Sequence, residues 1–380
     1  MTAAAVRVRH PVGPSPATER FLASADLPTP YLVLDPQVVA DRYGQLRAAL
    51  PAAEVHYAVK ACPHPEVLRT LVALGCGFDV ASPGEVELVI AAGADPDRIC
   101  YGNPVRGPGD VAAAHAAGVR RFVTDSAEDV RLLAARAPGA RVLVRLLVSD
   151  AGSATPFAAK FGVLRDEAVR LVGAVADAGL VPEGIAFHSG SQQVRPEAFA
   201  DGLAAARDVA EDAGLPRPVL DVGGGFPVAY RDPVPDLAAY AAAIRAAAAG
   251  ADLMLEPGRA LVAEAGLIRS TVLRASRRPG VDHRRWVFLD VGRYSGLAET
   301  ENEAIAYRLR VPGRTGPDEP VVLAGPTCDG DDVLYRRTPC PLPLSLEAGD
   351  AVDLLAAGAY TASYASVGFN GIAPLPVHVV

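Results

Sequence analysis

The sequence predicts an α/β protein in which a TIM-like (β/α)8 barrel precedes an all-β domain, and two observations predict it. Over residues 29–268, short apolar runs alternate with longer stretches whose apolar residues recur every three or four positions. After residue 269, helical stretches become scarce and short strands follow one another between turns. We therefore expect a barrel over 29–268 and a β-sandwich or β-barrel domain over 269–380, which residues 1–28 complete.

The first region contains eight candidate strands. In chain order they are "EVHYAV", "GFDVA", "RICYG", "RFVTD", "RVLVRL", "GIAFHS", "VLDVGGG" and "DLMLEP". Intervening stretches such as "HPEVLRTLVALG" and "PGEVELVIAAG" have the apolar spacing of amphipathic helices. Eight such units fit a closed barrel, and an open doubly wound sheet is the alternative fold.

The second region contains the strand candidates of an all-β domain. They are "LIRSTVLRAS", "RRWVFLDVG", "EPVVLAGP", "DAVDLLAAG" and "LPVHVV". At the other end of the chain, we expect the strand candidate "VRVRHPV" to join this domain.

Composition excludes several classes of function. The 380 residues carry a formal net charge of −8, which argues against nucleic acid or an anionic membrane surface as a partner. The five cysteines form no CxxC pair, so neither a disulfide framework nor a metal site is predicted. The N-terminal stretch has no apolar core of signal-peptide length, and no apolar run is long enough to cross a bilayer. We expect a cytoplasmic globular protein.

In barrel enzymes the chemistry lies where strands end and loops begin. The functional candidates at the ends of the expected strands are Lys60, Asp79, Arg145, His188, Gly223–Gly225 and Glu256. Turns are polar in any protein, so the kinds of residue decide more than their polarity. A lone lysine in this place is usually a surface side chain, and Lys60 needs support from the other residues.

Two motifs favour a bound phosphate. "LDVGGGFP" places three glycines after a strand, where backbone N–H groups can approach a phosphate closely, although glycines also make tight turns. In "LEPGRALVAEAG", Gly258 and the guanidinium of Arg259 can bind a second side of the same phosphate. Neither motif is a GxGxxG fingerprint or a P-loop, so neither a dinucleotide nor a nucleoside triphosphate is indicated.

Glu256 and His188 narrow the choice of cofactor. A carboxylate at Glu256 is costly to bury unless it meets a proton-bearing partner such as a pyridinium nitrogen, the alternative being an ordinary ion pair at the strand end. His188 in "FHSGSQ" can cover an aromatic ring or can be a satisfied core residue. Together with an amine at Lys60 for a Schiff base, these residues describe a site for a phosphorylated pyridine aldehyde, which is pyridoxal 5′-phosphate (PLP).

The sequence resembles the PLP-dependent decarboxylases of the alanine-racemase fold (fold type III), which act on ornithine, lysine, arginine and diaminopimelate. The resemblance rests on motifs that follow one another along almost the whole chain: "HYAVKACPHPEVLRTLVALGCGFDVASPGEVELV", "RICYGNPVR", "FHSGSQ", "LDVGGGFP", "EPGR", "GPTCDGDD" and "GAYTASYASVGFNG". The last two are similar to the ornithine/lysine branch, whereas the diaminopimelate branch has a glutamate in place of Asp329.

The resemblance implies a role for each matching residue. Lys60 forms the Schiff base, His188 stacks on the ring, Glu256 keeps the ring nitrogen protonated, and Cys328 protonates the substrate Cα. The further cofactor-binding residues that it implies are Asp79, Arg145, Ser191, Gly223, Gly224, Gly225, Gly258, Arg259 and Tyr360. The substrate-binding residues that it implies are Cys328, Asp329, Tyr294 and Phe369.

The resemblance also implies a homodimer with shared active sites. Cys328 and Asp329 would come from the partner subunit, and an ion pair between Lys160 and Asp332 would cross the dimer interface.

The implied reaction is the decarboxylation of a basic L-amino acid, L-ornithine or L-lysine, to a diamine and CO2. Decarboxylation of arginine, diaminopimelate, carboxynorspermidine or a specialised-metabolism substrate stays open, and so does a non-catalytic decarboxylase-like regulator. Eukaryotic ornithine decarboxylases have an aspartate where this chain has Val291. Whether Asp290, Glu299 or only Asp329 recognises the substrate side chain is likewise open.

Overall fold

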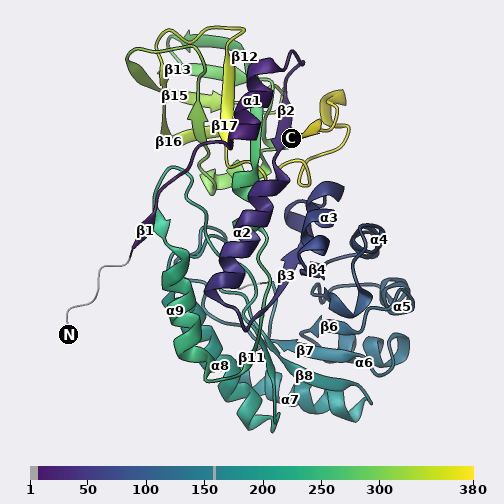
Figure 1. Ribbon diagram of the computed structural model, residues 1–380. Helices are drawn as coiled ribbons and strands as arrows, with labels where there is room; N and C mark the ends of the chain where they lie inside the picture. Colours follow the sequence, from purple (N-terminus) through teal and green to yellow (C-terminus); the bar gives the residue numbers. More distant parts are fainter. Residues whose placement is uncertain (1–6, 157–159) are drawn as a thin grey trace, which may run out of the picture. The chain divides into compact units, whose positions relative to one another are not determined.

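The computed structural model describes residues 7–156 and 160–380, and the chain divides into two compact units (Figure 1). The first unit comprises residues 7–9, 40–227 and 234–260, and the second comprises residues 10–39, 228–233 and 261–380.

In the first unit, eight parallel strands of the described chain close into a barrel in the order β11-β3-β4-β5-β6-β7-β8-β9. These strands are β3 (Glu54–Ala58), β4 (Gly77–Val80), β5 (Ile99–Tyr101), β6 (Arg121–Thr124), β7 (Arg141–Arg145), β8 (Val181–Ala186), β9 (Val219–Asp221) and β11 (Asp252–Leu255). The helices on the outside of the strands are α2 (Pro36–Ala49), α3 (Pro65–Ala73), α4 (Pro83–Ala91), α5 (Pro108–Ala116), α6 (Ala127–Arg136), α7 (Arg165–Asp177), α8 (Glu197–Asp212) and α9 (Leu237–Ala248) (Figure 1). The first turn of α2 belongs to the second unit. The closed strand order confirms the predicted barrel and excludes the open sheet.

Local sequence fixes where these helices begin. Pro65, Pro83 and Pro108 are each the first residue of a helix, a position at which the missing N–H leaves no hydrogen bond unmade. Ser126 caps α6 and Asp236 caps α9, and their side-chain oxygens accept backbone N–H groups of the first turn at 3.2 and 3.0 Å. Such starts keep strand-to-helix loops short, so side chains at the strand ends stay at the rim of the barrel.

The barrel interior is packed in its middle with small and medium apolar side chains. Cys100, Val123, Leu143, Ala186 and Met254 form one buried cluster, to which five different strands contribute. A filled barrel has no central channel, so ligands are confined to its ends.

The amino-terminal end of the barrel carries an ionic network around the buried Arg121 that the sequence analysis did not anticipate. Arg121, at the start of β6, donates to both carboxylate oxygens of Glu183 on β8 at 2.7 and 2.8 Å. The same guanidinium donates to Glu54, at the start of β3, at 3.1 Å. Charges at this end of such a barrel serve stability rather than catalysis, so we assign the network a structural role.

The second unit is built on a sheet with the strand order β14-β17-β12-β13-β15-β16, and β2 pairs with both β12 and β18. Its strands are β2 (Tyr31–Leu34), β12 (Gly266–Arg278), β13 (Asp282–Leu289), β14 (Arg308–Arg310), β15 (Asp318–Ala324), β16 (Val333–Pro343), β17 (Ala351–Leu355) and β18 (Val377–Val379). It also contains the helix α1 (Pro16–Ser24). The prediction of an all-β second domain is confirmed, with this one helix added.

The structure corrects the expectation for the N-terminal segment. The strand expected to join the β domain is β1 (Val8–Arg9), which pairs antiparallel with β10 (Val234–Pro235) in the first unit. So short a strand takes whichever edge lies near it, and its pattern does not specify that edge. Conversely, β2 lies within residues 29–39, which we expected at the start of the barrel, and it belongs to the second unit because it pairs with β12 and β18.

Candidate active site

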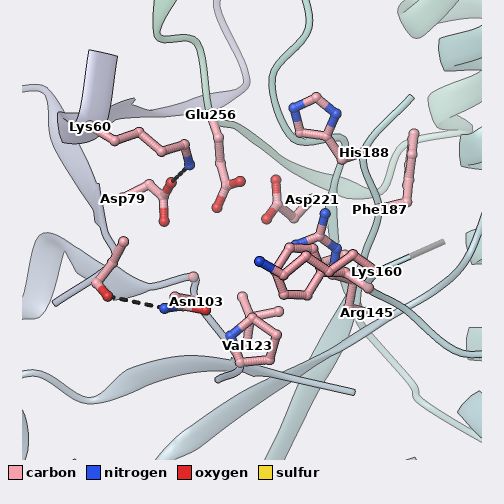
Figure 2. A pocket seen from close by; sticks show the side chains of 15 residues that line it. Lys60, Asp79, Asn103, Val123, Arg145, Lys160, Phe187, His188, Asp221 and Glu256 are labelled. Carbon is pink, nitrogen blue, oxygen red and sulfur yellow. Dashed lines mark hydrogen bonds and ion pairs between the residues drawn. The ribbon is translucent and has the colours of Figure 1, made fainter. Parts of the chain in front are cut away.

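A cavity of about 310 Å³ opens at the carboxyl ends of the barrel strands. Lys60, Asp79, Arg145, His188, Asp221 and Glu256 line it, and their side chains point toward one another (Figure 2). Each of these residues lies within two residues of the carboxyl end of a barrel strand. The structure thus brings together the strand-end residues predicted from the sequence, with Asp221 added to them.

Lys60 lies in a single helical turn, Val59–Ala61, that follows β3 directly. Its Nζ donates to Oδ2 of Asp79 at 3.0 Å (Figure 2). The Asp79 side chain is 3 % exposed, whereas that of Lys60 is 51 % exposed toward the cavity side. A buried carboxylate therefore holds an accessible amine in place, which is the arrangement needed to present a nucleophilic lysine.

Glycine at position 102 makes room for these carboxylates. A Cβ at Gly102 would lie 2.2 Å from Oδ1 of Asp79 and 3.5 Å from Oε1 of Glu256. Neither of these two oxygens has a hydrogen-bond partner among the described residues, although both are buried. Buried acceptors without partners are rare in proteins, so the two oxygens indicate a ligand that carries hydrogen-bond donors.

Burial controls the protonation of Glu256 and His188. It raises the pKa of Glu256 well above its usual range, and the negative charges of Asp221 and Asp79 add to this effect. Burial lowers the pKa of His188 to about 3, and the positive charges of Arg145 and Lys60 contribute. His188 is therefore a neutral imidazole whose Nδ1 accepts from the backbone N–H of Gly190 at 3.0 Å.

The three glycines after β9 pack against the ends of the neighbouring strands. Gly223 and Gly225 have positive φ angles of 66° and 93°. A Cβ would lie 2.4 Å from the carbonyl oxygen of Phe187 at position 223 and 2.6 Å from that of Glu256 at position 224. The loop therefore requires glycine and exposes backbone that a side chain would otherwise cover.

The other residues predicted to bind phosphate lie beside this loop. A Cβ at Gly225 would lie 2.3 Å from the carbonyl oxygen of Gly190, the residue before Ser191. The guanidinium of Arg259 donates to Oγ of Ser191 at 3.3 Å, although Arg259 is only 5 % exposed. Gly258 precedes Arg259 at the start of α10 (Arg259–Val262). The loop, the serine hydroxyl and the guanidinium form one anion site from segments that are distant in the sequence.

These residues fit PLP on the observations above. The amine of Lys60 matches the aldehyde of the cofactor. The buried carboxylate oxygen of Glu256, which has no partner among the described residues, matches the ring nitrogen. The anion site of glycine backbone and guanidinium matches the phosphate. The described residues contain no cluster of three or more His, Cys, Asp or Glu side chains that could hold a metal ion. None of the described helices is both long and apolar enough to span a membrane.

The predicted substrate residues form a cluster in the second unit. The ring centroids of Tyr294 and Phe369 lie 4.6 Å apart. Burial raises the pKa of Tyr294, and the charge and a hydrogen bond of Asp329 raise it further. Sγ of the exposed Cys328 lies 3.5 Å from Nδ2 of Asn370, a contact that the sequence analysis missed. Tyr360, predicted to bind phosphate, belongs to the same unit and has a left-handed backbone with a φ of 54°.

The structure reduces the number of carboxylates that could recognise the side chain of the substrate. Oδ1 of Asp290 accepts from the Ser270 hydroxyl at 2.6 Å and from the backbone N–H of Thr271 at 3.0 Å. Its Oδ2 accepts from the Thr29 hydroxyl at 2.5 Å. Val291 is fully buried. Asp290 therefore anchors strands within its own unit, and of the carboxylates considered, Asp329 and Glu299 remain for a substrate ammonium.

Asp332, which we expect to pair with Lys160 across the dimer interface, is also held within its own chain. It is 2 % exposed, and its carboxylate accepts from the backbone N–H of Arg293 at 2.8 Å and from the backbone and hydroxyl of Thr327 at 3.0 and 2.7 Å. A Cβ at Gly292 would lie 2.3 Å from one of its oxygens. Asp332 therefore orders its own loop, and the ion pair with Lys160 stays a prediction.

Three functional features escaped the sequence analysis: Asp221, Gly102 and Asn370. A signal was present for Asp221, because an acidic residue ends the apolar strand just before the three glycines. No comparable signal marks Gly102, whose importance depends on a side chain from the neighbouring strand.

Comparisons with known proteins agree with the site. Residues 37–263 match the family model of the pyridoxal-dependent decarboxylase, pyridoxal binding domain. The lysine/ornithine decarboxylase of Selenomonas ruminantium is 37 % identical over 353 residues, which cover 91 % of this chain and 88 % of that protein. The crystal structure of SrLDC in complex with PLP and cadaverine has a TM-score of 0.86 and 36 % identity, and the match covers 98 % of this chain and 95 % of the other.

A second solved structure extends the likeness. The lysine/ornithine decarboxylase from Vibrio vulnificus, complexed with cadaverine, has a TM-score of 0.86 and 31 % identity, over 97 % of this chain and 100 % of the other. The barrel, the strand-end residues and these matches lead to one conclusion: the chain belongs to the family of pyridoxal-dependent decarboxylases.

Proposed function

We propose that this protein uses PLP to decarboxylate a basic L-amino acid, L-ornithine or L-lysine, and releases putrescine or cadaverine together with CO2. The observation that carries the proposal is the pair of Lys60 and Asp79 at the rim of a barrel cavity that also contains Glu256. The relatives at 37 % and 31 % identity, both named lysine/ornithine decarboxylases, support this substrate class.

We assign the roles of the barrel residues from their places in the cavity. PLP, when bound, supplies an electron sink for the electron pair that remains at Cα after CO2 is lost. Lys60 holds the cofactor through its amine, and Glu256 holds a proton at the ring nitrogen. His188, as a neutral imidazole, would stack on the ring and would add no charge.

The anion site binds the phosphate group. It consists of Ser191, Gly223, Gly224, Gly225, Gly258 and Arg259, and Tyr360 is a further candidate for binding the phosphate. Asp79 orients Lys60, and Arg145 lies in the same cavity. Because Arg259 is almost fully buried, its charge acts in a medium of low dielectric constant and favours the phosphate strongly.

We further propose that the active enzyme is a homodimer with shared sites. Cys328 of one subunit would protonate Cα in the barrel of the other, and Asp329 would bind the distal ammonium of the substrate. Tyr294 and Phe369 would lie along the substrate chain. The contact of the Cys328 thiol with the Asn370 amide supports a defined orientation of this acid.

We place the enzyme in the cytoplasm and in the formation of diamines for polyamine biosynthesis. All five of its cysteines are free thiols, as suits a reducing compartment. Arginine, diaminopimelate or another amino acid as substrate, and a regulator without activity, are the alternatives.

A decarboxylation panel tests the proposal. The purified protein is saturated with PLP, and CO2 release is measured from ornithine, lysine, arginine and diaminopimelate under the same conditions. We expect the highest kcat/KM with ornithine or lysine. A preference for arginine or diaminopimelate would overturn the substrate assignment, and absence of turnover in a protein that binds PLP would favour the regulator.

A further inference from the structure

Asp221 and Glu256 lie carboxylate to carboxylate in the cavity. Both side chains are turned into the same space (Figure 2), and they are in hydrogen-bond contact with each other. Asp221 is 1 % exposed, and Oε1 of Glu256 is buried. Two ionised carboxylates so close together in a buried place repel strongly, so a hydrogen bond between them requires a proton on one of them.

The charged groups around the pair do not remove the need for this proton. Asp79 adds a third negative charge. Lys60, which favours ionised Glu256, already donates to Asp79, and Arg121, which favours ionised Asp221, is held by Glu183 and Glu54. The thiol of Cys100 is a further titratable neighbour, which burial keeps neutral by raising its pKa well above the usual value. His188 and Arg145 line the same cavity, and burial keeps His188 neutral by lowering its pKa to about 3.

The hydrogen bonds of the pair show how Asp221 is held. Oδ1 of Asp221 accepts from the backbone N–H of Gly223 at 2.9 Å. Oε1 of Glu256 is buried and accepts no hydrogen bond from an N–H or O–H donor in the part of the chain that the structure describes. Because Oδ1 of Asp221 serves the glycine loop, its Oδ2 is the oxygen that can carry a proton toward Glu256.

We propose that Asp221 is a positioning residue that shares a proton with Glu256 and thereby holds the carboxylate of Glu256 in place for the ring nitrogen of the cofactor. The inference rests on the proposed role of Glu256. Beside a protonated ring nitrogen, Glu256 is favoured as the anion, and the shared proton then lies on Asp221. Asp221 acts as a neutral acid that donates a hydrogen bond to Glu256 while its own carbonyl oxygen holds the glycine loop.

In the absence of cofactor the pair already holds a proton. Burial raises the pKa of Asp221 to about 7 and raises the pKa of Glu256 well above its usual range. The hydrogen bond between them raises the pKa of Glu256 and lowers that of Asp221, so the shared proton then lies on Glu256. The pair therefore retains at least one proton at neutral pH, and no proton has to be taken from solvent for the hydrogen bond to form.

Two substitutions of Asp221 distinguish a neutral donor from an ionised carboxylate. In Asp221→Asn, the amide keeps an oxygen for Gly223 and a permanent N–H donor for Glu256, whereas Asp221→Ala loses both contacts. The dissociation constant of PLP is measured by fluorescence titration of the cofactor-free full-length protein. We expect Asp221→Asn to stay within about threefold of the wild type and Asp221→Ala to bind at least about tenfold more weakly, as for a lost hydrogen bond to a charged group.

A double-mutant cycle shows whether Asp221 acts through Glu256. We expect Asp221→Ala to weaken binding by a clearly smaller factor when Glu256→Ala is already present than in the wild type, because only the contact with the glycine loop is then left to lose. Additive effects of the two substitutions would overturn the inference about Asp221 but not the role of Glu256. An Asp221→Asn variant that binds PLP as weakly as Asp221→Ala would do the same. A Glu256→Ala variant that binds PLP as tightly as the wild type would overturn the role proposed for Glu256 and the inference with it.

The pH dependence of stability examines the shared proton without any cofactor. Since the pKa of Asp221 is raised from 3.8 to about 7, its contribution to folding is greatest at low pH and is lost as the pH rises through this range. As the pH rises from 3.8 to about 7, the melting temperature of the wild type should therefore fall by several degrees relative to that of Asp221→Asn. An unchanged difference would overturn the shared proton.

Asp35→Asn is the matched control for this measurement. Asp35 also accepts a backbone N–H two residues later, from Gln37 at 2.9 Å, but its other oxygen accepts from the Ser15 hydroxyl at 2.5 Å. Asp35→Asn makes the same exchange of carboxylate for amide at a place away from the pair. A drift as large as that of Asp221→Asn would trace the effect to the exchange itself and overturn the assignment to the pair.

Discussion

The Nζ of Lys60 lies 3.0 Å from Oδ2 of Asp79, and the two side chains differ in exposure by more than tenfold, 51 % against 3 %. The anion is fixed in the barrel wall, while the cation reaches into the cavity. Such a pair adds little to stability, because the exposed partner is screened by water. The pair instead serves to hold the amine of Lys60 where it can react with the aldehyde of a cofactor.

Replacement of Lys60 by alanine should abolish both the visible absorbance of bound PLP and the turnover. We expect kcat to fall by at least about a thousandfold, because the amine that holds the cofactor is lost. The sequence contains two lysines, Lys60 and Lys160, and both line the cavity. Lys160→Ala is therefore the matched control and should still form an adduct that borohydride reduces. If Lys60→Ala also formed that adduct at Lys160, the assignment of Lys60 would be wrong.

Replacement of Glu256 by glutamine tests the charge at the ring nitrogen while it keeps the size of the side chain. An amide favours the unprotonated nitrogen, so the electron sink weakens. We expect kcat to fall about a hundredfold, which corresponds to about 2.7 kcal/mol of transition-state stabilisation. Steady-state kinetics at saturating PLP measure this, and unchanged kcat with bound cofactor would contradict the role.

Replacement of Asp332 by alanine should destabilise the loop that carries Cys328. Three hydrogen bonds to a buried carboxylate are lost, and we expect a loss of about 3 kcal/mol in the free energy of unfolding. Asp331→Ala is the control, because Asp331 is the exposed neighbour in the same loop. Denaturant unfolding compares the two variants, and equal stabilities would refute the structural role of Asp332.

His188 makes a pH-dependent contribution to stability. Its pKa is lowered from 6.5 to about 3 in the folded protein, so its contribution is fully present above pH 6.5 and is lost as the pH falls toward 3. We expect the melting temperature of the cofactor-free wild type to fall relative to that of His188→Gln over this range. A constant difference would mean that His188 titrates normally and is not buried as a neutral ring.

Much of the site could be predicted because a barrel gathers residues that are far apart in sequence. Lys60, His188 and Glu256 each follow a strand, and closure of the sheet alone brings such positions to one rim. Their relation to Asp221 and Gly102 could not be predicted, since it depends on side-chain directions and on distances of a few ångströms between strands. The alternation of strands and helices shows that a residue lies at the rim of the barrel. It does not show which neighbouring side chain that residue contacts.

The corrections and the features that were not predicted have a similar physical origin. The sequence places Asp332 among acidic loop residues that ordinarily face water, and its burial follows from Gly292, a residue of a different segment. The N-terminal strand β1 was assigned to the wrong unit because two residues carry no pattern that selects one sheet edge over another. The network around Arg121 was missed because its charges start strands, where the pattern resembles a solvated loop.

The last prediction concerns the shared active site of the proposed homodimer. Cys328 lies in the second unit of the chain, and Lys60 lies in the first. If each site takes Lys60 from one subunit and Cys328 from the other, Lys60→Ala and Cys328→Ala are each inactive alone but complement each other. Random exchange makes half of the dimers mixed, and each mixed dimer has one intact site, so about a quarter of the native activity should return.

The complementation experiment mixes equal amounts of the two variants, allows subunit exchange and measures CO2 release. Sedimentation of differently labelled subunits shows how far exchange has proceeded, so that the activity can be compared with the fraction of mixed dimers. Each variant incubated alone is the control for residual activity. Activity that grows in proportion to the mixed dimers supports the shared site. If mixed dimers form and stay inactive, Cys328 acts within its own chain, and the second unit must then reach the barrel cavity of the same subunit.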